Sequence, residues 1–463
     1  MLMKSISGIR GTIGGQRGEN LTPVDVVKFV SAYALERRQA FPKPVELKVV
    51  LGRDGRSSGP LLHELVSSVL RFSGITVLDA GLATTPTVEM AVLQEKAQGG
   101  IILSASHNPA QWNALKLLNE KGEFLDAEAG AQVLELAEAV GMEFPGYEDL
   151  GQAVILEDPL GRHIEAVLAL DSVLGEEIGT RGYKVVVDGI NSVGGIAVPR
   201  LLEALGLKDI SVINGEANGR FAHNPEPLDE HLGEIKDKVL ASGADLGIVV
   251  DPDVDRLAFI DEQGKMFGEE YTLVAVGDYI LSHYHPCYYQ KIAVSNLSSS
   301  RALKDVAERH GGGYFSAAVG EVNVVAKMKE TGAAIGGEGN GGIIYPDLHY
   351  GRDALVGIAL FLSALAESGL KMSEYKERFP KYEMIKDRID LAPGTDISGI
   401  LRKIKEGITE GKIDETDGIK IDFDDSWLHL RASNTEPIIR IYAEGKEAAA
   451  AKEKIERVKE LIK

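Results

Sequence analysis

Short apolar runs alternate with amphipathic stretches along the first three quarters of the chain. The first series places strands at 46–51, 75–78 and 99–103, with a helical pattern at 61–72 after the first of them. Apolar, β-rich runs that alternate with helical patterns are typical of parallel sheets covered by helices. The pattern therefore predicts an α/β domain at the start of the chain.

The same order of elements recurs twice further along the chain. A second series begins at GYKVVVD and ends with a strand at 246–250, and a third begins at KIAVS and ends at AAIGG. Three series predict three related α/β domains. The length of 463 residues agrees with several domains, because chains of this length rarely fold around a single hydrophobic core.

The pattern changes after about residue 376. The segments KYEMIKDRIDLAP, GIKIDFDDSWLHLRAS and PIIRIYAEG are typical of strands, and helices are expected at 400–406 and 447–462. Strands segregated from helices predict a smaller α+β domain. We therefore expect an α/β fold in which three related domains with mostly parallel sheets and a fourth, α+β domain surround a central cleft. The predicted boundaries are 1–153, 154–257, 258–373 and 374–463.

A polar loop follows the third strand of each series: SASHNP at 104–109, DPDVDR at 251–256 and GEGNGG at 337–342. In α/β sheets, ligands bind beyond the carboxyl ends of the strands. Three unrelated polar turns are the alternative, since turns commonly end strands. The threefold recurrence favours three equivalent loops that converge on one cleft.

The net charge of the chain disfavours some classes of binding partner. The chain has 70 acidic and 50 basic residues and a formal charge of −20, which opposes binding to nucleic acids and anionic membranes. A single cysteine, Cys287, makes an intrachain disulfide impossible and fits a reducing compartment. The start of the chain lacks the apolar core of a signal peptide, and no apolar run approaches membrane-spanning length. We therefore expect a cytoplasmic protein that binds neither nucleic acid nor membrane.

The loop DPDVDR carries Asp251, Asp253 and Asp255 at alternating positions, so that several oxygens can point at one cation. An EF-hand is excluded because Arg256 stands where that loop needs glycine, and because the flanks are strand-like. A few carboxylates without a complete protein cage suit Mg²⁺, which also accepts phosphate oxygens. A solvated acidic turn is the alternative.

The loop SASHNP offers a nucleophile. Either Ser104 or Ser106 could accept a phosphoryl group near a divalent cation and an imidazole. For His107 itself, a local hydrogen-bonding role is the expectation. Lys116 could move protons, although a lysine on a strand is usually a surface charge.

Two further loops suit a phosphorylated sugar. In GEGNGG, Glu338 and Asn340 can accept and donate hydrogen bonds to adjacent sugar hydroxyls. In RASNTEP, Arg431 supplies a planar charged fork, and hydroxyl and amide donors follow it, which suits a phosphate dianion. These donors are Ser433, Asn434 and Thr435. A hairpin turn with incidental polarity is the alternative for RASNTEP.

Taken together in this order and spacing, SASHNP, DPDVDR, GEGNGG and RASNTEP, with SGIRG at 7–11, resemble the α-D-phosphohexomutase superfamily. The resemblance spans essentially the whole chain. It implies three α/β domains and a fourth that closes a central cleft. It also selects Ser106 over Ser104 as the serine that carries the phosphoryl group.

The resemblance implies a role for each loop. It implies that Mg²⁺ is held by phospho-Ser106 with Asp251, Asp253 and Asp255, and that Lys116 is the general acid/base. It implies that Glu338 and Asn340 bind the sugar hydroxyls, and that Arg10 and Arg256 act electrostatically near the transferring phosphoryl group. The residues implied to bind the substrate phosphate are Arg431, Ser433, Asn434 and Thr435. Phospho-Ser106 then phosphorylates a hexose phosphate to a 1,6-bisphosphate, which reorients and returns its other phosphoryl group. The hexose 1,6-bisphosphate is thus both intermediate and activator.

The chain departs from many relatives in the sugar loop. Where they carry GE-x-SGH, it has Asn340 and Gly342, so a histidine that could be the second acid/base is absent there. His349 is the nearest replacement, and Arg352 is a further candidate for the cleft. The GEGNGG variant resembles a subgroup assigned mainly to phosphoglucosamine or phosphomannose mutases.

The expected activity is therefore a phosphoglucosamine mutase that converts glucosamine 6-phosphate to glucosamine 1-phosphate. A phosphomannomutase/phosphoglucomutase is the alternative within the superfamily. A sugar-phosphate phosphatase and a non-catalytic sugar-phosphate sensor are the alternatives outside it. The expected partner is a small phosphosugar, and the chain is expected to be a monomer or homodimer.

Overall fold

A computed structural model describes residues 1–5, 8–139, 143–284, 289–392, 395–408, 410–432 and 438–462. The chain divides into two compact units. The first contains Met1–Thr272 and Asn340–Lys376, and the second contains Leu273–Gly339 and Glu377–Lys463. Among the described helices, none combines the length and apolar character needed to cross a membrane.

The first unit begins with a mixed sheet whose described strands follow the order β1-β2-β6-β5-β3-β4-β7. The neighbours β5, β3, β4 and β7 run parallel, whereas β1, β2 and β6 add antiparallel pairs at one side. The strands are β1 (Leu2–Ser5), β2 (Gly8–Thr12), β3 (Lys48–Arg53), β4 (Thr76–Leu82), β5 (Gly99–Leu103), β6 (Trp112–Leu118) and β7 (Ala153–Ile155).

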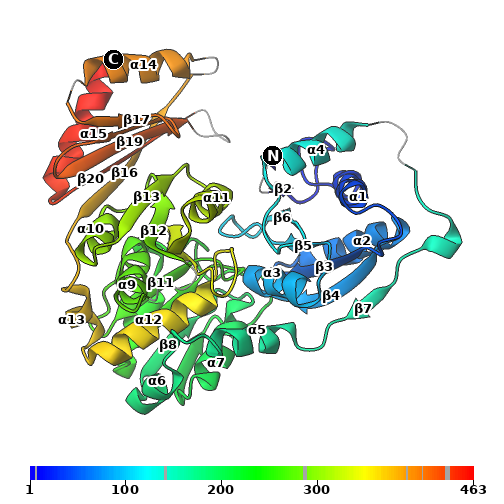
Figure 1. Cartoon of the computed structure of the whole chain (residues 1–463), viewed down its shortest axis with the longest axis horizontal. Coiled ribbons are helices and arrows are strands. Elements are labelled where there is room, and N and C mark those ends of the chain that lie inside the picture. Colours follow the sequence, from blue (N-terminus) through cyan, green and yellow to red (C-terminus); the bar gives the residue numbers. More distant parts are fainter. Residues whose placement is uncertain are drawn as a thin grey trace. The chain divides into compact units, whose positions relative to one another are not determined.

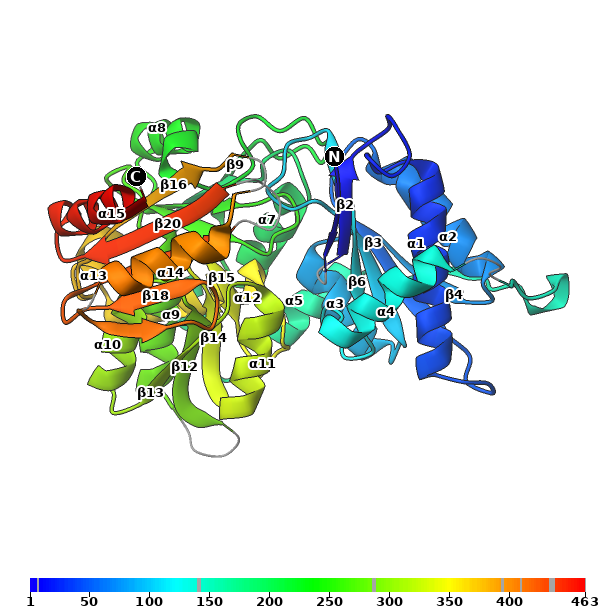
Figure 2. The ribbon, with the colours of Figure 1, turned by 90° about the horizontal axis from the view of Figure 1, so that it is seen from above.

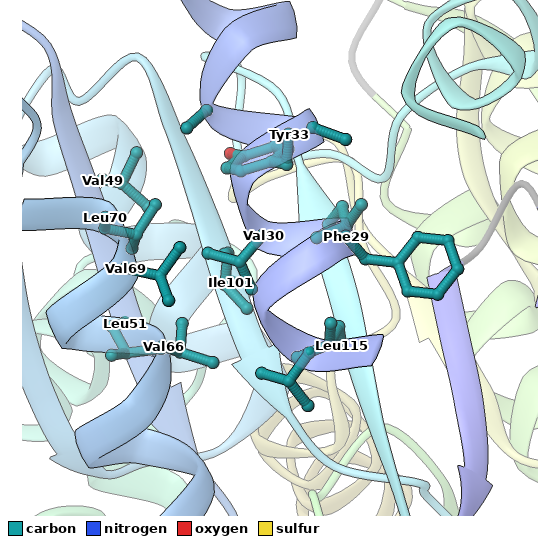
Figure 3. Close-up of a cluster of buried hydrophobic side chains, with 14 of the residues drawn as sticks. Phe29, Val30, Tyr33, Val49, Leu51, Val66, Val69, Leu70, Ile101 and Leu115 are labelled. Atoms are coloured by element: carbon teal, nitrogen blue, oxygen red, sulfur yellow. The ribbon is translucent and has the colours of Figure 1, made fainter. Parts of the chain in front are cut away.

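Apolar side chains hold helices against this sheet. The helices are α1 (Pro23–Ala40), α2 (Gly59–Phe72), α3 (Thr85–Gln94) and α4 (Ala127–Glu138), with a 3-10 turn at Tyr147–Asp149. One core cluster contains Phe29 and Val30 of α1, Val66 of α2, Leu51 of β3 and Ile101 of β5, and Figure 3 shows Val30 and Ile101 between Val66 and Leu51 on one side and the outward-pointing Phe29 ring on the other. Helix α3 lies on the opposite face of the sheet (Figure 1).

A second sheet in the first unit has the order β11-β10-β8-β9, with only β10 and β11 antiparallel. Its elements are β8 (Lys184–Asp188), β9 (Asp209–Ile213), β10 (Leu246–Val250), β11 (Leu257–Asp261), α5 (Pro159–Leu168), α6 (Gly175–Arg181), α7 (Gly194–Ala204), α8 (Gly233–Ser242) and a 3-10 turn at Asp229–His231. The unit is completed by β15 (Gly342–Ile344), α12 (Ala354–Ser368) and α13 (Met372–Lys376). Helix α12 packs against α5, α6 and α7, so it is buried along most of its length.

The second unit contains three parallel strands in the order β13-β12-β14 and a C-terminal antiparallel sheet in the order β16-β20-β19-β18-β17. The first group has α9 (Glu269–Ser282), which crosses the unit boundary, β12 (Gln290–Asn296), α10 (Ala302–Arg309), β13 (Gly313–Ala317), α11 (Glu321–Thr331) and β14 (Ala333–Glu338). The second has β16 (Glu383–Asp390), α14 (Ile397–Gly407), β17 (Lys412–Asp414), β18 (Ile419–Asp422), β19 (Ser426–Ala432), β20 (Ile438–Gly445) and α15 (Ala448–Ile462).

The two C-terminal helices cover one face of the antiparallel sheet (Figures 1 and 2). Ile404 of α14 and Val458 of α15 pack with Leu428, Ile439 and Ile441 of the sheet. This two-layer arrangement is the α+β organisation that the sequence predicts. The α/β alternation before it is confirmed as well. The strands β1 and β2 and the short strands β7 and β17 were not predicted, because they stand outside the alternation of apolar and helical segments, whereas β11 is the strand expected after the loop DPDVDR.

Two neighbouring leucines of α2 test the core. Leu62 is 7% exposed and belongs to the core cluster, whereas Leu61 is 74% exposed. Leu62→Ala should lower the stability of this domain by about 2–4 kcal/mol, because it removes buried methyl groups and leaves a cavity. Leu61→Ala should change it by about 0.5 kcal/mol or less. Calorimetric unfolding measures both, and equal shifts would contradict this packing.

Candidate active site

Ser106 lies just beyond the buried strand β5, in a turn with unusual backbone geometry. Its φ is +49°, in the left-handed region that non-glycine residues rarely adopt. Such a residue costs of order 1–3 kcal/mol and is typically retained at functional sites. The turn directs the Ser106 hydroxyl to the Oδ2 atom of Asp251, with an Oγ–Oδ2 distance of 2.6 Å. The Ser106 amide donates to Ser104 Oγ at 3.0 Å.

Arg56 holds the backbone of this turn, and sequence reasoning missed it. Its guanidinium donates to the carbonyl oxygens of Ser106 (2.6 Å), Asn108 (2.7 Å), Pro109 (2.7 Å) and Trp112 (2.9 Å). Its Nε donates to Asp54 at 3.0 Å, and the side chain is fully buried. The two terminal nitrogens of the guanidinium thus fix the loop around Ser106, while its Nε is held by Asp54. The available signal was an arginine in GRDGRSSG, a strand-end loop that looks like an ordinary turn.

The three aspartates lie in the connection between the antiparallel strands β10 and β11. Asp251, Asp253 and Asp255 are each 0% exposed, and one carboxylate oxygen of each lies within 4.8 Å of the others. The Oδ1 atom of Asp251 accepts from the amides of Asp255 and Arg256, both at 3.1 Å. Val254 has a φ of +62°, which is rare for a β-branched residue. The loop is therefore held in a conformation that gathers carboxylates.

Cationic and hydroxyl donors meet this aspartate loop. Lys116 of β6 donates to Asp253 Oδ2 at 2.6 Å and to Asp255 Oδ2 at 3.1 Å. Thr85 Oγ1 donates to Asp253 Oδ2 at 2.6 Å, and Arg352 donates to Asp255 Oδ2 at 2.8 Å. Burial opposes the charge of Lys116, but Asp253 and Asp255 outweigh it and raise the pKa of the lysine. Lys116 is therefore an ammonium group in the site.

The carboxylates still have capacity for a cation. The Oδ1 atoms of Asp253 and Asp255 are buried and accept no hydrogen bond from any residue that the structure describes. Burial and the charges of Asp255 and Asp253 raise the pKa of Asp251 well above its usual value. Although burial opposes it, Arg352 and Lys116 lower the pKa of Asp255. Buried oxygens without donors are costly, and a hard divalent cation is the ligand that carboxylates of this kind accept. The residues present therefore fit Mg²⁺.

Arg10, Arg256 and His107 lie close to the aspartates. Arg10 donates to Asn108 Oδ1 at 3.1 Å, and Arg256 pairs with Glu226 Oε1 at 3.0 Å. Burial, with the charges of Arg256 and Arg10, holds the pKa of His107 well below its usual value, so the ring is neutral near pH 7. Burial and the neighbouring Arg256 also lower the pKa of Arg10. The two arginines thus face the same small region.

His349 lies elsewhere in the first unit. Its ring is buried, with Nε2 3.3 Å from Asp353 Oδ2 and Nδ1 3.5 Å from Glu89 Oε2. The second of the predicted cleft residues, Arg352, does reach the aspartate loop through Asp255.

The sugar and phosphate loops are divided between the units. In the second unit, Glu338 accepts from Asn296 Nδ2 at 2.9 Å and from the Gly320 amide at 3.0 Å. Asn340 belongs to the first unit, where its Oδ1 accepts from the Gly342 amide at 3.2 Å.

The phosphate loop is described only at its start. Arg431 Nε lies 3.3 Å from Asp417 Oδ2 within the second unit. Ser433, Asn434 and Thr435 lie outside the described residues.

Comparison with known proteins identifies the family. Four domain families of phosphoglucomutase/phosphomannomutase match in order: α/β/α domain I at residues 3–142, domain II at 162–264, domain III at 269–382 and the C-terminal domain at 387–461. Together they extend over most of the chain.

Relatives match over nearly the full length of both chains. A phosphoglucomutase/phosphomannomutase of Thermococcus kodakarensis is 37% identical over 452 residues, which are 96% of each chain. A phosphoglucosamine/phosphogalactosamine mutase of Sulfurisphaera tokodaii is 33% identical over 461 residues, 98% of each chain. The fold also matches a solved phosphoglucomutase/phosphomannomutase family protein of Burkholderia thailandensis, with a TM-score of 0.85, 24% identity and coverage of 100% and 98%. These matches confirm the resemblance drawn from the four loops, and the chain belongs to the α-D-phosphohexomutase superfamily.

Proposed function

We propose that this protein moves a phosphoryl group between O6 and O1 of a hexose phosphate through phospho-Ser106 and a 1,6-bisphosphate, with glucosamine 6-phosphate as the preferred substrate. One observation carries the proposal. The Ser106 hydroxyl lies 2.6 Å from Asp251, in a site that also contains Asp253, Asp255 and the Lys116 ammonium. Ser104 is the weaker candidate, because its Oγ accepts the Ser106 amide instead.

In the proposed transfer, the bond from phosphorus to Ser106 Oγ breaks as a bond from phosphorus to a sugar oxygen forms. The proton of the sugar hydroxyl leaves, and Ser106 Oγ ends the step with a proton, so the transfer is balanced. The Lys116 ammonium is proposed to give a proton to Ser106 Oγ as the bond to phosphorus breaks, and the resulting amine is proposed to take up the proton of the sugar hydroxyl. The reverse transfer from the other end of the bisphosphate restores phospho-Ser106, and the cycle needs no other phosphoryl donor.

The remaining residues are proposed to position the reacting groups or to neutralise charge. Arg56 fixes the backbone around Ser106, while Arg10 and Arg256 are proposed to stabilise the charge that develops on the transferred group. Asp251, Asp253 and Asp255 are proposed to hold Mg²⁺, which when bound would neutralise phosphate oxygens. Glu338, Asn340 and the loop from Arg431 through Ser433, Asn434 and Thr435 are proposed to bind the sugar and its phosphate.

The substrate proposal rests on the GEGNGG loop and on the Sulfurisphaera tokodaii relative, whose name includes phosphoglucosamine. A second candidate is a phosphomannomutase/phosphoglucomutase, which the name of the Thermococcus kodakarensis relative favours. A phosphatase would use the same serine and aspartates but release inorganic phosphate. A non-catalytic sensor would have no need for a buried serine, lysine and aspartate triad.

Replacing the proposed phosphoryl carrier tests the central residue. Ser106→Ala should remove the single phosphoryl group from the purified protein and lower kcat/KM by about 1,000-fold or more. Ser104→Ala is the matched control and should keep the phosphoryl group. Intact-mass analysis and a mutase assay measure both, and a phosphorylated or fully active Ser106→Ala variant would refute the assignment.

The metal assignment is tested with two aspartates of one hairpin. Asp253→Asn should reduce Mg²⁺-dependent turnover by about 100-fold or more, because a neutral amide is a poorer cation ligand. Asp261→Asn, on the neighbouring strand β11, should leave turnover unchanged, since its Oδ1 accepts the backbone amides of Gln263 and Lys265, which an asparagine oxygen can also accept. Equal activity of the two variants at all Mg²⁺ concentrations would exclude the aspartate loop as the metal site.

The substrate is tested by comparing kcat/KM for the 6-phosphates of glucosamine, mannose and glucose, each with catalytic bisphosphate present. Glucosamine 6-phosphate is expected to give the highest value. A higher value for mannose or glucose 6-phosphate would select the second candidate, and stoichiometric release of inorganic phosphate would select the phosphatase.

A further inference from the structure

A buried cluster of polar side chains, joined by hydrogen bonds and close charged contacts, lies in the first unit, outside the residues that act on the phosphoryl group in the proposed function. It joins segments from three of the matched domain families. The members are Thr87 and Glu89 of α3, His163 of α5, and His349 and Asp353, which precede α12; this set is termed the histidine cluster.

Asp353 is the centre of the histidine cluster. Its Oδ1 atom caps α12 by accepting from the amides of Leu355 (2.8 Å) and Val356 (3.3 Å). Its Oδ2 atom lies 2.9 Å from His163 Nε2 and 3.3 Å from His349 Nε2. Although burial opposes it, the two histidines lower the pKa of Asp353, so the carboxylate is charged. Each Nε2 must therefore carry a proton, which fixes both rings.

A chain of hydroxyls links the histidine cluster to the start of α3. Thr84 Oγ1 accepts the Thr87 amide at 3.0 Å and donates to Thr87 Oγ1 at 2.7 Å. Thr87 Oγ1 also lies 3.0 Å from His163 Nδ1, within hydrogen-bond distance. The first turn of α3 is thus joined through His163 to Asp353, and so to the first turn of α12.

The residues beside these two turns hold the aspartate loop. From α3, the Thr85 amide donates to the Asp253 carbonyl at 2.9 Å and its hydroxyl donates to Asp253 Oδ2 at 2.6 Å. Next to Asp353, Arg352 donates to Asp255 Oδ2 at 2.8 Å, and the Ala354 amide donates to the Val254 carbonyl at 3.2 Å. Two helix starts, tied together by the histidine cluster, therefore contact three consecutive residues of the loop.

We propose that the histidine cluster is a positioning device that sets the separation of the first turns of α3 and α12, and so the geometry of the aspartate carboxylates. His349 then acts through Asp353 and is not an acid or base on the substrate. The effect on turnover rests on the proposed phosphoryl transfer, whereas the effect on Mg²⁺ affinity rests only on the proposed metal site. A transition metal held by His163, His349 and Asp353, whose ligand atoms lie within 4.8 Å of one another, is the competing account.

Asp353→Asn is the sharpest test. Asparagine caps helices about as well as aspartate, but its amide cannot accept both imidazole protons through one oxygen while the other caps α12. We expect kcat to fall by about 10- to 100-fold and the dissociation constant for Mg²⁺ to rise by about 10-fold, as for other residues that orient metal ligands. The KM for the sugar phosphate should change by less than about 3-fold, because the proposed effect acts through the aspartate loop and its metal.

His163→Gln is the second variant and should change kcat and Mg²⁺ affinity in the same direction. Arg162→Ala is the matched control. Arg162 precedes His163 and pairs at 2.6 Å with Glu95, the C-cap residue of α3, so it links the same two helices at a partly exposed edge. This variant should keep the wild-type kcat and Mg²⁺ affinity. Calorimetric titration with MgCl₂ and steady-state kinetics, with thermal unfolding as the check on folding, measure all three.

Wild-type kcat and Mg²⁺ affinity in folded Asp353→Asn and His163→Gln would overturn the proposal. An equal loss in Arg162→Ala would also overturn it, because it would show a general effect of helix packing. One equivalent of tightly bound zinc that Asp353→Asn removes would replace it with the metal account. If the wild-type protein has no mutase activity, the proposed function fails, and the MgCl₂ titrations still decide the positioning role.

Discussion

Three carboxylates buried on one short loop are the constraint on which the first unit depends. Removing Asp251, Asp253 and Asp255 from water is tolerable only if positive charge and hydrogen-bond donors compensate for the lost solvation. Lys116 and Arg352 supply part of that charge, from strands and loops distant in sequence. Two Oδ1 atoms are left without a donor among the described residues, which leaves a place for a cation.

The same constraint explains why the unit is built from several matched domains. Lys116 is contributed by domain I, the aspartates by domain II, and Arg352 by domain III. No one of these domains could neutralise the loop alone. Strained backbone at Ser106 and Val254 adds a further cost, which the clamp of Arg56 and the buried flanking strands must offset. The packing in this region therefore offsets the free-energy cost of holding Ser106 beside the buried aspartates.

Much of the fold could be predicted because short stretches of the sequence determine where its strands and helices form. The alternation of apolar strands and helical stretches predicts the parallel strands β3, β4 and β5 and the C-terminal layer, and the strand-end loops indicate where Ser106 and the aspartates lie. Arg56 was missed because an arginine in a turn has no periodic pattern, and its four carbonyl partners lie about fifty residues away. The contact between His163 and Asp353 joins residues 190 positions apart, and no local pattern predicts it. Antiparallel additions such as β1 and β17 depend on tertiary pairing for the same reason.

The most direct measurement follows the phosphoryl group through one turnover. Protein carrying ³²P on Ser106 would be mixed with excess unlabelled hexose 6-phosphate and quenched at short times. The account predicts that the label leaves the protein and enters sugar phosphate, through the bisphosphate, at a rate no slower than kcat and without inorganic phosphate. Label that stays on the protein while product forms, or that appears as inorganic phosphate, would contradict it.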